Sequence, residues 1–138
     1  MKTTHQFYFE NAKKMPAVSS GSVDLVVTSP PYPMIEMWDE VFSLQDKSIE
    51  KALKANDGPT AFELMHRQLD AVWQEVDRVL QPSGIVCVNI GDATRTIRGD
   101  FALYPNHSRI IAFFLKQGFT AMPVILWRKQ TNAPNKFM

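Results

Sequence analysis

The chain has little cysteine, no long apolar run and almost no net charge, and each shortage excludes a class of protein. Cys87 is the single cysteine among 138 residues, so no internal disulfide can form, and its apolar neighbours predict a small buried side chain. No stretch approaches the roughly 20 apolar residues that span a bilayer. The net charge of +1 gives no overall attraction to a polyanion. We therefore expect a cytoplasmic protein without a membrane segment.

Apolar runs predict three strands. Residues 23–27 and 85–90 are short, valine-rich and nearly unbroken, which is typical of strands covered on both faces in a parallel sheet. Residues 120–127 predict a third strand, and Pro123 within it favours a place near the edge of the sheet. The aromatic residues at 7–9 indicate a further short strand.

Helical periodicity predicts two clear helices. Thr60 and Glu63 have the spacing of a capping box, and Pro82 and Gly84 would end the helix that follows. Its apolar face comprises Phe62, Met65, Leu69, Val72, Val76 and Val79. A second helix is expected over residues 106–117, ended by a glycine, and residues 34–57 could hold one or two short helices.

The order strand, helix, strand, helix, strand predicts one α/β domain over residues 1–138, with a parallel sheet in three αβα layers. Ligands of such sheets bind outside the carboxyl ends of the strands. Ser29, Tyr32, Gly91 and Asp92 should therefore share one rim.

The segment "TSPPY" at the end of the first strand carries the most specific chemistry. Pro30 and Pro31 have no amide hydrogens, so the Pro30 carbonyl is a rigid acceptor, and the Ser29 hydroxyl adds a second one. Tyr32 adds a flat face for stacking. Two acceptors beside a π surface match an amino group on an aromatic heterocycle. A rigid turn with Tyr32 packed on a helix is the alternative interpretation.

Three segments together resemble the amino-group DNA methyltransferases. They read "GSVDLVVTSPPY", "VDRVLQPSGIVCVNIGD" and "GFTAMPVILWRKQTNAP", in that family's order and at plausible spacing. The resemblance implies a Rossmann-like methyltransferase fold and S-adenosylmethionine as cofactor. It also implies methylation of an exocyclic base amine in DNA, a reaction found in restriction-modification systems.

The resemblance assigns catalysis to Ser29, Pro30, Pro31 and Tyr32. Hydrogen bonds to the Ser29 hydroxyl and the Pro30 carbonyl would draw the amine hydrogens out of the ring plane, before direct methyl transfer without a covalent enzyme intermediate. The base would be flipped out and stacked on Tyr32. Serine in the first position favours N4 of cytosine, with N6 of adenine as the alternative. Thr28 and Ser29 would contact the cofactor.

Further polar residues are candidates for contacts with the DNA. Asn89 and Asp92 could equally be an ordinary turn signal, Arg95 and Arg98 solvated loop charges, and Trp127 a core residue. The resemblance also implies that Trp127, Lys129 and Asn132 lie near a loop that flanks the target pocket. The full set of predicted substrate-binding residues is Asn89, Asp92, Arg95, Arg98, Trp127, Lys129 and Asn132. The three histidines lack metal-ligand spacing, so we expect no metal and read them as surface or capping residues.

The six glycines never form the Gly-rich turn, F-x-G-x-G, in which this family cradles its cofactor. The chain therefore resembles the catalytic half of such an enzyme without the cofactor half, which leaves the first strand with an open edge. A second polypeptide or a second copy could complete the sheet. Alternatively, the chain is an inactive fragment that acts as an interaction module.

Overall fold

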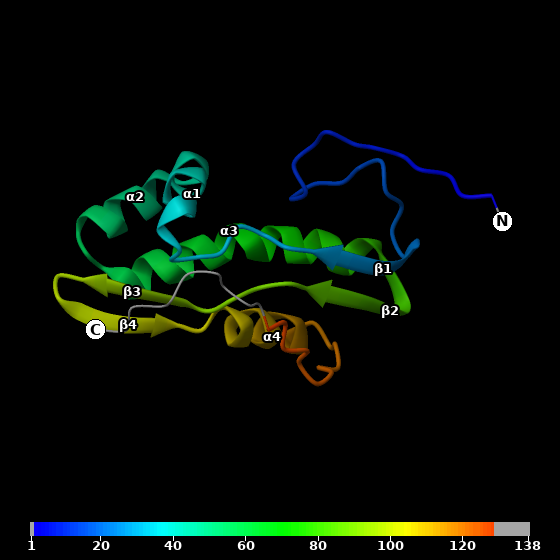
Figure 1. Ribbon diagram of the computed structural model, residues 1–138. Helices are drawn as coiled ribbons and strands as arrows, with labels where there is room; N and C mark the ends of the chain where they lie inside the picture. The colour runs from blue at the N-terminus through cyan, green and yellow to red at the C-terminus, as the bar shows by residue number, and fades with distance from the viewer. Residues whose placement is uncertain (1, 129–138) are drawn as a thin grey trace.

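The structure is a computed structural model that describes residues 2–128 (Figure 1). The elements, in chain order, are β1 (Val23–Thr28), η1 (Glu36–Trp38), α1 (Asp39–Gln45), α2 (Lys47–Lys54), α3 (Gly58–Val79), β2 (Leu80–Val88), β3 (Ala93–Ile97), β4 (Asp100–Tyr104) and α4 (Asn106–Lys116). This is a mixed α/β arrangement with a parallel strand pair, as predicted.

The two valine-rich segments pair as predicted. β1 and β2 are parallel, with Leu25 opposite Ile85 and Thr28 opposite Val88. β2 begins earlier than expected, at Leu80, directly after α3 ends. The register shifts between residues 23 and 25 of β1, so residues 81–84 of β2 form an irregular stretch there. The predicted helix breakers at 82 and 84 therefore lie inside β2.

The segment expected to be a loop after β2 is instead an antiparallel hairpin. β3 and β4 pair from Ala93 opposite Tyr104 to Ile97 opposite Asp100. Two residues connect the strands, and both have positive φ, 53° at Arg98 and 87° at Gly99, as a tight primed turn requires. The loop prediction was wrong because an Arg-Gly pair between short strands is a weaker signal than Asn-Gly.

The long helix begins before its predicted cap. The Asp57 side chain, not that of Thr60, caps α3, and it accepts a hydrogen bond from the Thr60 amide at 3.1 Å. Pro59 stands in the first turn, where a missing amide hydrogen costs nothing. The capping-box prediction placed the helix start too late, because Asp57 followed by Gly and Pro is the stronger start signal.

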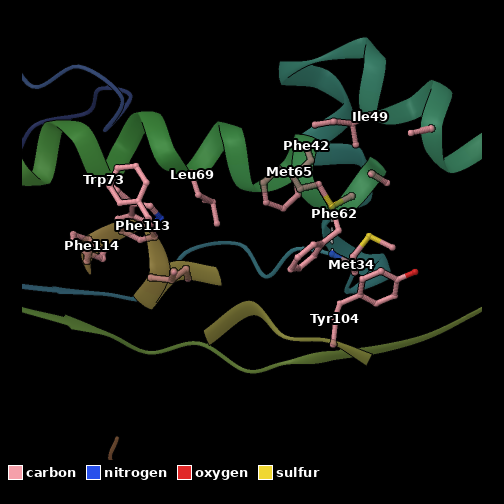
Figure 2. Close-up of a cluster of buried hydrophobic side chains, with 14 of the residues drawn as sticks. Met34, Phe42, Ile49, Phe62, Met65, Leu69, Trp73, Tyr104, Phe113 and Phe114 are labelled. Atoms are coloured by element: carbon pink, nitrogen blue, oxygen red, sulfur yellow. Dashed lines mark hydrogen bonds between the residues drawn. The ribbon is translucent and has the colours of Figure 1, made fainter. Parts of the chain in front are cut away.

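The core lies between α3, α4 and one face of the β1–β2 pair. Figure 2 shows Trp73 and Leu69 of α3 beside Phe113 and Phe114 of α4, and the Trp73 and Phe114 rings are 5.6 Å apart. The predicted apolar face of α3 is confirmed at Phe62, Met65, Leu69, Val76 and Val79, all buried. Val26, Val86 and Val88 pack against this cluster from the strands.

The opposite face of the β1–β2 pair is open in the described part of the chain. Leu25 is 53% exposed, Val27 72% and Ile85 58%, and Cys87 is exposed beside them. The expectation that both strands are covered on both faces, with Cys87 buried, was therefore wrong for residues 2–128. The described helices supply one layer against the sheet, whereas burial of both faces requires two.

Two further predicted strands do not form. Residues 7–9 and 120–127 have no regular secondary structure, and Phe9 and Ile125 are almost fully exposed. An apolar run becomes a strand only when a neighbour satisfies its backbone hydrogen bonds, and no strand of the described chain lies beside either segment. Among the helices of residues 2–128, none has the length and hydrophobicity needed to cross a bilayer.

Gly58, the first residue of α3, packs closely against the hairpin. We expect Gly58→Ala to destabilise the fold by about 1–3 kcal/mol. A methyl group there would overlap the hydroxyl of buried Tyr104 and lie 2.9 Å from Ile97 Cδ1. Urea unfolding measures the loss. Tyr104→Phe removes the overlapping hydroxyl, so the alanine should cost less in that background; an equal cost would contradict the steric explanation.

Candidate active site

The "TSPPY" segment leaves the carboxyl end of β1 beside the end of β2. The Thr28 carbonyl accepts a hydrogen bond from the Asn89 amide at 2.8 Å, so the two strand ends lie side by side. Ser29 is exposed and Tyr32 is half-buried, and their hydroxyl oxygens are 3.5 Å apart. The structure thus brings Ser29, Tyr32 and Asn89 to one rim and leaves the Ser29 hydroxyl accessible.

The chain turns sharply after Tyr32. The Tyr32 carbonyl accepts from the Ile35 amide at 3.2 Å, and Met34 adopts a left-handed conformation with φ of 66°. Met34 is buried, and its amide donates to Met65 Sδ at 3.3 Å. The packing of Met34 anchors the motif to α3. Figure 2 shows Met34 between the long helix and the hairpin.

The Tyr32 ring lies against the backbone of Gly91, in the loop after β2. A Cβ atom at Gly91 would be 3.3 Å from Tyr32 Cε2, closer than an ordinary contact. A side chain at this position would push the ring away or shift the loop. Gly91, placed on the rim by sequence alone, therefore has a specific packing role toward the motif.

Asn106, which sequence reasoning did not select, holds both loops from behind. It is fully buried as the first residue of α4, and its Nδ2 donates to the carbonyls of Pro33 at 3.1 Å and Gly91 at 3.0 Å. Its Oδ1 lies 2.9 Å from Nε2 of His66 on α3. An asparagine after a proline indicates a helix start but carries no sign of this role.

His66 is buried, so the expectation of a surface or capping histidine was wrong here. Its ring meets that of Phe62 edge-on, with centroids 4.5 Å apart. Burial lowers the pKa of His66 to about 4, and the hydrogen bond with Asn106 opposes this shift only in part. Its position four residues after Phe62, on the apolar face of α3, was the signal that could have predicted burial.

Asp92 and His107 interact with each other at the start of α4. Asp92 Oδ1 accepts from the His107 amide at 3.1 Å and lies 2.7 Å from His107 Nδ1. A carboxylate in this place satisfies a free amide of the first helical turn. His107 is exposed, as expected of a surface histidine, whereas contact of Asp92 with substrate stays a prediction.

Arg95, one of the two arginines predicted to meet DNA phosphates, is already paired. Its Nη1 and Nη2 donate to the two carboxylate oxygens of Asp39 at 2.9 and 2.7 Å, and the pair is largely buried. This hydrogen bonding raises the pKa of Arg95. Arg95 therefore ties β3 to α1 and is not a solvated loop charge, whereas its contact with phosphate stays a prediction. Arg98 is exposed at the hairpin turn.

The remaining predicted substrate residues lie near the end of the described chain or beyond it. Trp127 is 70% exposed, so it is not a core residue of the described chain, and Lys129 and Asn132 lie outside the described residues. Two surface hollows border the start of α3, each lined by Pro59 and Glu63, and neither includes a residue of the "TSPPY" segment. Within residues 2–128 no three metal-ligating side chains cluster.

Known proteins are similar to this chain in sequence. The model of the DNA methylase family of N6 and N4 methyltransferases matches residues 23–137. The chain is 53% identical to the type II methyltransferase M.MthZI of Methanothermobacter thermautotrophicus, over 100% of this chain and 39% of that protein. It is 49% identical to M.MjaI of Methanocaldococcus jannaschii, over 99% and 48%.

Solved structures agree with the sequence matches. TTHA0409 of Thermus thermophilus, which is assigned as a DNA modification methylase, superposes with a TM-score of 0.65 at 27% identity, over 94% of this chain and 47% of that one. Its complex with S-adenosyl-L-methionine gives 0.58 at 29%, over 80% and 38%. The chain spans less than half the length of each of these proteins. With its motif at the rim of a matching fold, the chain belongs to the N6 and N4 DNA methylase family.

Proposed function

We propose that this chain supplies the base-binding and amine-activating part of a DNA methyltransferase that modifies N4 of cytosine. The observation that carries this proposal is the exposed Ser29 hydroxyl, 3.5 Å from that of Tyr32, at the carboxyl end of β1. Two relatives named as type II methyltransferases align with 99–100% of this chain at 49–53% sequence identity. Because the substrate is DNA, we place the protein in the cytoplasm.

Amine activation follows from the chemistry of the segment. The lone pair of an exocyclic amine is delocalised into the base and is a poor nucleophile. The Ser29 hydroxyl and the Pro30 carbonyl accept the two amine hydrogens and favour a tetrahedral nitrogen, an interaction that strengthens toward the transition state. Pro30 and Pro31 offer no amide hydrogen that would compete for these acceptors.

Tyr32 serves as the stacking face for the flipped base in this proposal. Its ring already rests on the Gly91 backbone, so one side is supported by the protein. Stacking on an aromatic side chain is worth about 1–3 kcal/mol per base, comparable to the few kcal/mol that flipping costs. Asn89, whose amide bonds to Thr28 at the adjacent strand end, contacts the edge of the base in this proposal.

S-adenosylmethionine is the proposed cofactor, and when bound it supplies an electrophilic methyl group. In this proposal Thr28, the last residue of β1, and Ser29 contact the methyl end of this molecule. No glycine-rich turn opens a helix in residues 2–128 to hold its amino-acid end. In this proposal the amino-acid end of the cofactor is therefore held by residues other than those described.

We propose that a second polypeptide supplies these residues and covers the open face of the β1–β2 pair. More than half of each curated relative lies outside the match. The exposed Leu25, Val27, Ile85 and Cys87 form an apolar strip of the kind that another layer of the fold would bury. A homodimer across the same face is the alternative.

A methylation assay with a split enzyme tests both proposals. The full chain would be mixed with labelled S-adenosylmethionine and plasmid DNA, alone and together with the part of M.MthZI that lies outside the match. We expect N4-methylcytosine after digestion to nucleosides, and only in the mixture of both parts. N6-methyladenine would overturn the cytosine assignment. Product from the chain alone would overturn the need for a partner, and no product from either would favour the inactive interaction module.

A further inference from the structure

Three separate segments of the site meet at one buried amide. Asn106 Nδ2 donates to the carbonyls of Pro33 and Gly91, and its Oδ1 faces His66 Nε2. Pro33 directly follows Tyr32, and the Tyr32 ring packs against the backbone of Gly91. One of the two carbonyls therefore belongs to the residue that follows Tyr32. The other belongs to the residue against which the Tyr32 ring lies.

The donors and acceptors of this cluster allow a single arrangement. Two carbonyls can only accept, so both hydrogens of the Asn106 amide must point to them. Its oxygen then accepts, which requires the hydrogen of His66 on Nε2 and leaves Nδ1 bare. His66 Nδ1 is buried without a hydrogen-bond partner among the described residues. A bare ring nitrogen costs less in that place than an N–H donor would, and the neutral tautomer follows.

The amide cannot be replaced without leaving a buried group unpaired. Asn106, His66 and Pro33 are all buried, so the Pro33 carbonyl loses a buried partner if the amide is lost. The Met34 amide donates to the sulfur of Met65, which is a weak acceptor. Among the described residues, the bond from Asn106 to the Pro33 carbonyl is therefore the stronger hydrogen bond between this turn and the buried side.

We propose that Asn106, oriented by His66, is a positioning residue that fixes the Tyr32 loop against the Gly91 loop and so sets the place of the Tyr32 ring. Both residues are fully buried and act through the backbone of the two loops. The consequence for base stacking rests on the proposed function, whereas the coupling of the loops does not.

Amide hydrogen exchange tests the coupling without DNA or cofactor. The Ile35 amide reports on the turn after Tyr32, and the Asn89 amide reports on the strand ends. In Asn106→Asp the carboxylate faces two carbonyls, and we expect both amides to exchange at least about tenfold faster. His66→Gln keeps an N–H donor toward Asn106 and should stay within about threefold of the parent chain; His66→Leu removes it and should resemble Asn106→Asp.

A matched control separates local positioning from general loss of stability. Ile110→Ala removes a buried core side chain one turn along α4, and exchange would be compared at urea concentrations that equalise the free energies of unfolding. Equal acceleration in Ile110→Ala would overturn the proposal, as would unchanged exchange in Asn106→Asp. Asn106→Ser, which is smaller and uncharged, replaces the aspartate variant if that does not fold, with the same expected rise.

The methylation assay gives an independent readout. In the active split enzyme, Asn106→Ser should lower kcat by about tenfold, with little change in the KM for S-adenosylmethionine, because a displaced stacking face affects the transition state more than cofactor binding. Faster exchange with an unchanged kcat would confirm the coupling but overturn its catalytic consequence. Failure of the exchange test alone would leave the proposed function intact.

Discussion

Ser29→Ala should lower the kcat of methyl transfer by about 10²- to 10³-fold, the usual cost of removing one preorganised hydrogen-bonding group at a reacting centre. The variant removes one of the two acceptors available to the amine and leaves only the Pro30 carbonyl. Because the bonds to the amine strengthen as the nitrogen becomes tetrahedral, the loss should fall on kcat and leave KM for DNA nearly unchanged.

Single-turnover transfer of labelled methyl groups in the active split enzyme measures this effect. Ser22→Ala provides the matched control, because it makes the same chemical change just before β1, where the Ser22 hydroxyl bonds to the Ser19 carbonyl. We expect this control to keep the parent rate. A Ser29→Ala rate within threefold of the parent would show that the hydroxyl does not activate the amine.

Acidification from pH 6.5 to pH 4 should reduce the free energy of unfolding by about 3 kcal/mol through His66 alone. Burial lowers the pKa of His66 to about 4 in the folded chain, against an ordinary value of 6.5. Between these values the unfolded chain binds a proton that the folded chain does not. Stability therefore falls as the pH falls through this window, and it is fully present above pH 6.5.

Urea unfolding at a series of pH values measures the slope. His66→Gln cannot titrate, so its stability should fall much less over this range, whereas His5→Gln at an exposed position should follow the parent chain. Hydrogen bonds lower the pKa of carboxylates such as Asp46 and Glu75, but that stability is lost at lower pH and is common to all three chains. An identical slope in His66→Gln would contradict the assignment.

This acid sensitivity bears on the site as well as on the fold. A proton on Nδ1 of His66 would lie buried without an acceptor among the described residues, on the ring whose Nε2 bonds to the amide that holds the Pro33 and Gly91 carbonyls. We therefore expect the site to loosen over the same pH range in which stability falls. The Ile35 and Asn89 amides would report this change.

Sequence patterns predicted the elements whose signal is local. The parallel pair β1 and β2 follows from two valine-rich runs, and the long helix α3 from a continuous apolar face. The "TSPPY" segment lies at the predicted carboxyl end of its strand, with Asn89 beside it. These features depend on backbone propensity and periodicity, which a short stretch of sequence contains in full.

Sequence patterns failed where a feature depends on what lies across from it. Residues 120–127 have the composition of a strand but no described partner, and Leu25 and Val27 have the composition of a covered strand but no second helical layer. Arg95 resembles a phosphate ligand in sequence, yet Asp39, 56 residues away along the chain, pairs with it. Local sequence patterns do not show which residues far apart along the chain will form such contacts.

Local sequence patterns were sufficient to predict the family, the motif with its two acceptors and aromatic face, and the β1, β2 and α3 elements around it. The residues that hold this motif, Asn106 and His66, could be identified only in the folded chain. They lie on separate helices, and folding buries their polar atoms together. A buried polar group must find a partner or destabilise the fold. That requirement acts between segments distant in sequence, so it becomes visible only once the chain has folded.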